Sequence, residues 1–131
     1  MLDAIILEKT KNSPEIILDI ENNSFKIAGR SIVENPGEFY LPIYTWLDEY
    51  VKSPLDYTNF IIDLEYFNSS SARQIMEIIM LLEKIDENTD KKVKISWLYE
   101  EGDEMSKERG DEIKLVSKLD FEIKEYPSED F

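Results

Sequence analysis

One stretch of the chain, residues 60–85, constrains the fold more than any other. Its first eight residues, FIIDLEYF, begin with an apolar run and then alternate in polarity, which predicts a strand over residues 57–66. The polar cluster Asn68 to Ser71 interrupts this pattern. Beyond it, apolar residues recur at steps of three and four and predict a helix over residues 70–87: Ile75, Ile78, Ile79, Leu82 and Ile85. A buried strand that leads through a capping segment into an apolar-faced helix is half of a β-α-β unit.

The remaining segments are shorter and are placed around this unit. Further strands are predicted over residues 3–8, 15–20, 24–28 and 92–99, with a last short one containing Phe121, Ile123 and Tyr126. Two further helices are predicted over residues 38–52 and 105–117. Pro42 is tolerable in the earlier helix if it lies in the first turn, where N–H groups have no partner within the helix. In the later helix we expect Met105, Ile113 and Val116 to face inward, with Gly110 costing about 1 kcal/mol relative to Ala.

This order of elements predicts one α/β domain over residues 1–131. Right-handed β-α-β crossovers imply a mixed sheet whose C-terminal strands are parallel, with an antiparallel hairpin at one side and three helices. The strand at 57–66 is expected at the centre of the sheet with both faces covered, because of its apolar content. Trp46 and Trp97 are expected in the core.

The composition excludes several classes of function. The chain has no histidine and no cysteine, which removes His-based catalysis, disulfides and most zinc sites. We therefore expect a protein that is not an enzyme and needs no cofactor. With 29 acidic against 15 basic residues, its net charge of −14 disfavours nucleic acid and anionic membrane as partners. No apolar run approaches the roughly 18 residues of a membrane span, and the N-terminus lacks a secretory pattern, so we expect a cytoplasmic protein.

The polar cluster before the central helix is the first candidate site. Asn68 or Ser69 can cap the helix, and Ser71 with Gln74 forms an alternative capping box. A helix N-terminus also favours an anion, and phosphorylation of one hydroxyl would supply one. Arg73, four residues after Ser69, would then offer its guanidinium to the phosphate.

Two methionines lie beside this cluster on the same predicted helix. Because the five apolar residues above suffice for the core, Met76 and Met80 lie on the flank of the helix. Either both are buried by a neighbouring element, or they form an adaptable surface for a partner.

Two acidic groups are alternatives to a phosphorylation switch. Asp63 and Glu65 point to the same face of the strand and would form the paired acids of a small enzyme with a deep pocket at the strand end. The run Glu100, Glu101, Asp103 and Glu104 offers oxygen ligands to a hard cation, but it lacks the spacing of a calcium loop. We expect neither site.

Three stretches carry a resemblance to a known family: GRSIVENPGEFYLPIYTW at 29–46, DLEYFNSSSARQIMEIIMLLE at 63–83 and VKISWLYEE at 93–101. They resemble the bacterial SiaC family of biofilm-regulation phosphoproteins, small STAS-like domains similar to anti-sigma-factor antagonists. In that family the hydroxyl directly after the Asn, usually Thr, is phosphorylated. The resemblance therefore implies that Ser69, rather than Ser70, is the phosphorylation site. Arg73 stands where the family has Lys.

The resemblance also implies partners. They are a protein kinase related to anti-sigma factors, a metal-dependent Ser/Thr phosphatase and a diguanylate cyclase that the unmodified protein activates, which would control c-di-GMP and biofilm formation. The phosphate or partner would be met by Asn68, Ser71, Arg73, Met76 and Met80. An alternative in the same class is an anti-sigma-factor antagonist that sequesters an anti-sigma kinase. A neighbouring cyclase gene would favour the first function and a sigma-factor gene the second.

Overall fold

The structure is a computed structural model that describes residues 2–128. It contains six strands and three helices in the predicted order. Their bounds are β1 (Ile5–Leu7), β2 (Glu15–Asp19), β3 (Ser24–Ser31), α1 (Pro36–Tyr50), β4 (Tyr57–Phe67), α2 (Ser69–Asn88), β5 (Lys92–Glu100), α3 (Glu104–Val116) and β6 (Asp120–Tyr126). None of these helices is both long enough and apolar enough to cross a membrane.

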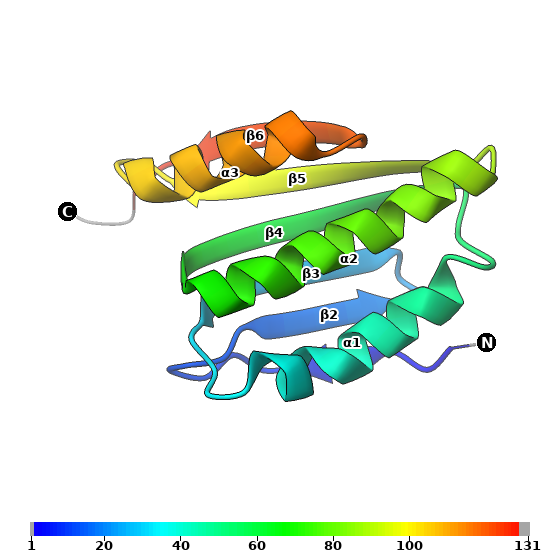
Figure 1. Cartoon of the computed structure of the whole chain (residues 1–131), viewed down its shortest axis with the longest axis horizontal. Coiled ribbons are helices and arrows are strands. Elements are labelled where there is room, and N and C mark those ends of the chain that lie inside the picture. Colours follow the sequence, from blue (N-terminus) through cyan, green and yellow to red (C-terminus); the bar gives the residue numbers. More distant parts are fainter. Residues whose placement is uncertain (1, 129–131) are drawn as a thin grey trace.

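The strands form one mixed sheet in which the spatial order equals the order along the chain, β1 to β6. The first three strands pair antiparallel, and β3 to β6 pair parallel (Figure 1). The predicted antiparallel hairpin at one side is thereby confirmed. The strand β4 lies between β3 and β5, so its predicted interior position is also confirmed.

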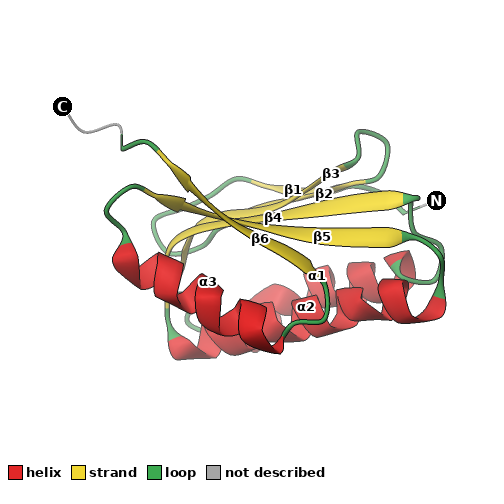
Figure 2. Ribbon diagram, turned by 90° about the horizontal axis from the view of Figure 1, so that it is seen from above, coloured by secondary structure: helices red, strands yellow, loops and turns green. Residues whose placement is uncertain are grey.

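All three helices cover the same face of the sheet (Figure 2). Each helix connects two parallel strands that are direct neighbours, and three right-handed crossovers in one direction must lie on one side. The prediction that both faces of β4 are covered was therefore wrong. Along β4 buried residues alternate with half-buried ones such as Ile61, so its apolar content exceeds what one covered face requires.

The uncovered face, which we call the bare face, carries polar contacts between strands. Side chains on neighbouring or nearby strands pair there, which satisfies their charges and hydrogen bonds without a covering layer. The pairs are Lys26 with Glu15 (3.3 Å), Lys94 with Glu122 (3.2 Å), Ser96 with Asn59 (2.7 Å) and Tyr126 with Asp63 (3.0 Å).

The core fills the space between the helices and the other face of the sheet. Both tryptophans are buried in it as predicted, and the apolar residues of α2 that the sequence singled out are all buried there. The helix α1 begins earlier than predicted, with Pro36 as its first residue after the cap Asn35. Pro42 consequently lies inside the helix and not in its first turn, so the condition for a harmless proline is not met.

The inward face of α3 also differs from the prediction. Ile113 is buried, but Met105 and Val116 are more than half exposed. Gly110 faces the core instead, because the indole of Trp97 lies where a side chain would be. The indole N–H of Trp97 donates a hydrogen bond to the carbonyl of Ser106 (3.0 Å), which holds α3 at this close distance.

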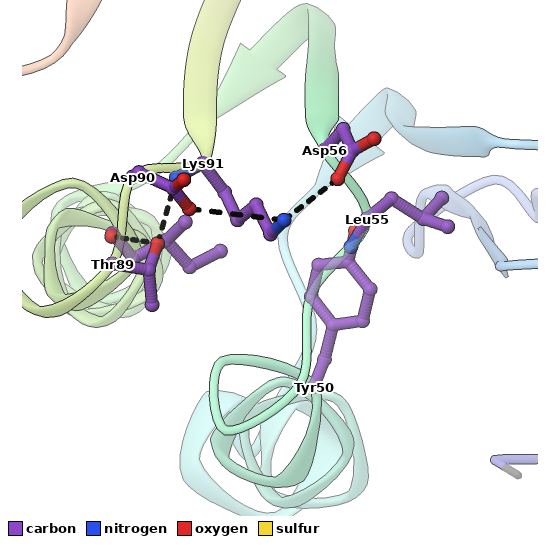
Figure 3. A network of polar contacts seen from close by, with 7 residues as sticks. Tyr50, Leu55, Asp56, Thr89, Asp90 and Lys91 are labelled. Carbon is purple, nitrogen blue, oxygen red and sulfur yellow. Dashed lines mark hydrogen bonds and ion pairs between the residues drawn. The ribbon is translucent and has the colours of Figure 1, made fainter.

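A polar network joins the helix ends to the strand starts at one edge of the sheet (Figure 3). The Nζ atom of Lys91 lies 2.8 Å from the carboxylate of Asp56. Thr89, the C-terminal cap of α2, accepts the backbone N–H of Lys91 (3.0 Å), and the hydroxyl of Tyr50 accepts the N–H of Leu55 (3.1 Å). The helices begin at the opposite edge of the sheet, which this network does not occupy.

Candidate functional site

The three helices all begin at the edge of the sheet where the parallel strands end (Figure 1). Each helix has an N-terminal cap whose side-chain oxygen accepts a backbone N–H three residues later: Asn35, Asn68 and Asp103. Helix N-termini present unpaired N–H groups and the positive end of a dipole. This edge is therefore the place in the molecule best suited to a negative group.

The cap of α2 is Asn68. Its Oδ1 accepts the backbone N–H of Ser71 at 2.9 Å. Of the caps that the sequence left open, the structure selects this one over Ser69 and over the pair Ser71 and Gln74. Ser69 and Ser70 are consequently the first two residues of the helix, and both are exposed. The cap of α2 therefore does not depend on the hydroxyl of Ser69.

Ser71 belongs to a buried chain of hydroxyls. The residue is fully buried, and its Oγ accepts a hydrogen bond from Ser31 at 2.8 Å. Since the single proton of the Ser31 hydroxyl is used there, the hydroxyl of Tyr40 donates to Ser31 at 2.6 Å. These bonds fix the first turn of α2 to β3 and α1. The prediction that Ser71 contacts a phosphate or a partner does not fit this placement, because the whole residue is covered.

We expect Tyr40→Phe to lower the free energy of unfolding at neutral pH by about 1 kcal/mol, because Ser31 loses its donor. Burial raises the pKa of Tyr40 to about 12. This pKa exceeds the 10.0 of an ordinary tyrosine. The contribution of the Tyr40 proton to the free energy of unfolding is therefore fully present below pH 10 and is lost as the pH rises through about 12.

Urea unfolding at pH 7, 10 and 11.5 tests this prediction. Between pH 10 and 11.5, the free energy of unfolding of the wild type should fall more steeply than that of Tyr40→Phe. The difference should approach one proton, or about 1.4 kcal/mol per pH unit. Equal slopes for the two proteins would show that Tyr40 does not titrate in this range in the folded state.

Two of the three arginines of the chain contact the end of β4, and the third follows that strand on α2. Arg73 is exposed on α2, one turn after Ser69, as the sequence predicts. The guanidinium of Arg30 lies 5.8 Å from the centre of the Tyr66 ring, and that of Arg109 lies 5.4 Å from the centre of the Phe67 ring. Sequence spacing could not place Arg30 and Arg109 here, because they come from β3 and α3 and only the sheet order brings them together.

The two methionines of α2 have different environments. Met80 is 59% exposed, whereas Met76 is partly buried against the core. Met80 borders a groove of about 380 Å³ whose walls come from α1 and α2, and Tyr44 and Lys84 also line it. Met76 is thus partly covered by the core and Met80 is left at the surface, and a partner surface at Met80 stays a prediction.

Comparison with known proteins identifies the family. The profile of the SiaC family, described as regulatory phosphoproteins, matches residues 7–126. The chain belongs to the SiaC family. The predicted resemblance is therefore confirmed.

Individual relatives of this SiaC-family protein come from Pseudomonas aeruginosa. An uncharacterized protein of strain UCBPP-PA14 is 25% identical over 114 residues, which are 87% of this chain and 90% of that protein. Apo-SiaC has the same fold with a TM-score of 0.84 at 22% identity, covering 94% of this chain and 99% of the relative. SiaC in complex with the diguanylate cyclase SiaD, which it activates, gives 0.85 at 23% identity, covering 93% and 99%.

The paired acids of this SiaC-family protein lie away from the start of α2. Asp63 and Glu65 border a cavity of about 520 Å³ that opens on the bare face, and Lys26 and Tyr126 also line it. Burial raises the pKa of Asp63, and the hydrogen bond from Tyr126 opposes that shift. The acids are thus tied into cross-strand pairs on the bare face, and they do not face Ser69.

The acidic residues at the end of β5 and in the loop after it have different structural roles. Asp103 caps α3 by accepting the N–H of Ser106 at 3.1 Å. Glu100 pairs with Tyr126 at the end of the ladder between β5 and β6. Within residues 2–128, no group of three or more acidic side chains is placed to hold a metal ion.

Proposed function

We propose that this SiaC-family protein binds and activates a diguanylate cyclase when Ser69 is unmodified, and that phosphorylation of Ser69 switches this activity off. The observation that carries the proposal is the position of Ser69: it is exposed, it is the first residue of α2, and it directly follows the cap Asn68. The activator SiaC in its complex with SiaD supports the choice of a cyclase over an anti-sigma kinase as the output partner.

The fold can accept a phosphate at Ser69 without rearrangement. The group would lie at the positive end of the α2 dipole, and Arg73 is exposed one turn further on. The first turn itself is fixed by the buried hydroxyls of Ser31, Tyr40 and Ser71. Phosphorylation therefore changes the charge of the surface and leaves the backbone in place.

The same charge disfavours a docked partner. Exposed apolar side chains lie on the same pair of helices: Leu41 of α1 is 62% exposed, and Met80, roughly 16 Å along α2 from Ser69, is 59% exposed. A partner that covers Met76 and Met80 would have to desolvate a phosphate of nearly two negative charges at the rim of the interface. That penalty releases the cyclase.

The other partners follow from this switch. A protein kinase related to anti-sigma factors would add the phosphate, and a metal-dependent Ser/Thr phosphatase would remove it. The protein itself would catalyse nothing and would act in the cytoplasm, where the nucleotide substrates of kinase and cyclase are found. The cyclase would make the second messenger c-di-GMP, and the switch would thereby control biofilm formation.

The proposal is tested by incubating the purified chain with the kinase of its own organism and mapping the phosphate by mass spectrometry. We expect phosphate on Ser69 in the wild type and in the control Ser70→Ala, and none in Ser69→Ala. Ser69→Ala should keep the stability of the wild type within a few tenths of a kcal/mol, because Asn68 supplies the cap. Phosphate outside residues 68–71 would contradict the proposal.

Binding to the purified cyclase gives the second measurement. The unmodified wild type and Ser69→Ala should bind and activate it, and phosphorylation should weaken binding of the wild type about a hundredfold or more. Ser69→Asp should lie between, because one carboxylate carries less charge and fewer acceptors than a phosphate. Equal binding by Ser69→Ala and Ser69→Asp would argue against a charge switch.

A further inference from the structure

A small pocket separates the start of α3 from the end of β4. Its volume is about 30 Å³, and Phe67, Met105, Ser106 and Arg109 are among the residues that line it. It lies at the edge where all three helices begin (Figure 1), and Phe67 is only two residues before Ser69. The pocket is large enough for one water molecule or for the tip of one side chain.

Ser106, one of the residues that line this pocket, has a hydroxyl without a hydrogen-bond partner among residues 2–128. Ser106 is 4% exposed, and its Oγ is the buried side-chain atom without a hydrogen bond in this part of the chain. Its backbone N–H and carbonyl are both engaged, with Asp103 and with the indole of Trp97. Buried hydroxyls are nearly always hydrogen-bonded, so this one requires an acceptor that the described chain does not supply.

Arg109 adds a second unused donor group to the same pocket. Its guanidinium stacks on Phe67 and is half-buried, yet it forms no ion pair with any described residue of a chain that has 29 acids. Two acids, Glu65 and Asp103, also line the pocket. Asp103 is engaged as the cap of α3, and Glu65 is exposed to solvent. An arginine held against an aromatic ring is pre-oriented for a carboxylate or a phosphate.

The rim of the pocket has the composition of a protein interface. Tyr66 is 46% exposed and Met105 is 61% exposed, and both residues line the pocket. Tyr, Met and Arg are enriched where proteins bind each other, particularly around a central pocket that one partner residue fills.

We propose that this pocket receives the carboxylate of an Asp or Glu side chain of the protein partner, which accepts hydrogen bonds from Ser106 and Arg109. The inference rests on the proposed function, because the partner is the cyclase that the unmodified protein binds. A water molecule would satisfy Ser106 and would leave Arg109 to the solvent. A carboxylate satisfies both, and it extends the interface from α2 across the end of β4 to α3.

The test is a titration of the purified cyclase with unphosphorylated wild type, Ser106→Ala, Arg109→Gln and the control Leu115→Ala, which lies on the same helix and is 86% exposed in the wild type. We expect Kd to rise about tenfold for Ser106→Ala and at least tenfold for Arg109→Gln, with no change for the control. The melting temperature of Ser106→Ala should equal or exceed that of the wild type, because an unpaired buried hydroxyl is removed.

Three other outcomes would each overturn the inference, and the measurements distinguish them. Wild-type Kd values for both pocket variants would mean that the pocket holds only water, while the proposed function stands. An effect of Arg109→Gln confined to the Ser69-phosphorylated protein, with the unmodified form unchanged, would assign the arginine to the chain's own phosphate. Failure of the unmodified wild type to bind the cyclase would overturn the proposed function and the inference together.

Discussion

Ile79→Asp is expected to prevent the domain from folding. Ile79 lies in the middle of α2, is fully buried and belongs to the core between the helices and the sheet. A carboxylate at this position would have no cation near it and would cost several kcal/mol, which is comparable with the roughly 5–15 kcal/mol that holds a domain of this size together. Circular dichroism should show no cooperative thermal transition at 25 °C or above.

The adjacent variant Met80→Asp is the matched control. It introduces the same carboxylate one residue further along the same helix, but Met80 is 59% exposed. We expect its melting temperature to stay within a few degrees of the wild type, and its binding to the cyclase to weaken. A normal melting transition for Ile79→Asp would mean that α2 packs on the sheet through a different face.

Gly110→Val is expected to lower the free energy of unfolding by about 3 kcal/mol. A Cβ at this position would lie 2.6 Å from Cδ1 and 2.7 Å from Nε1 of Trp97, and valine adds two further methyl groups there. Trp97 is fully buried and its indole is hydrogen-bonded to Ser106, so it cannot move aside easily. The gain in helix propensity over glycine, below 1 kcal/mol, does not offset this overlap.

Chemical denaturation and tryptophan fluorescence measure this effect. The control is Glu108→Val, which places the same side chain on an exposed position of α3 and should change stability by less than about 0.5 kcal/mol. If Gly110→Val is as stable as the control, α3 does not pack on Trp97 as the structure has it.

The central part of the fold could be predicted from periodicity alone. The strand at 57–66 and the helix at 70–87 agree with β4 and α2 to within one residue at every end, because long apolar patterns determine both. The position of Ser69 at the start of α2 follows from the same pattern. Its proposed role as the phosphorylation site rests on the family resemblance, since a hydroxyl beside a helix cap is by itself ordinary.

The errors arose where a tertiary contact overrides a local pattern. Apolar spacing suggested Met105 and Val116 for the inner face of α3, but the size of the Trp97 indole selects Gly110. Ser71 seemed available for a cap, but a hydroxyl chain through Ser31 and Tyr40 buries it. Likewise, the contacts of Arg30 and Arg109 with the end of β4 depend on how β3 and α3 pack beside that strand, which no local pattern encodes.

The identity of spatial and sequence order in the sheet has a consequence for how the protein is made. Each strand from β2 onward pairs with the strand synthesised just before it, so none has to be inserted between two strands that are already paired. As the chain leaves the ribosome, every new β-α unit can dock on a completed edge, and only β6 is added after α3 is complete. Because each new pairing spans a single hairpin or a single helical connection, the loop-closure entropy for each strand stays low for a protein with parallel strands, which favours folding.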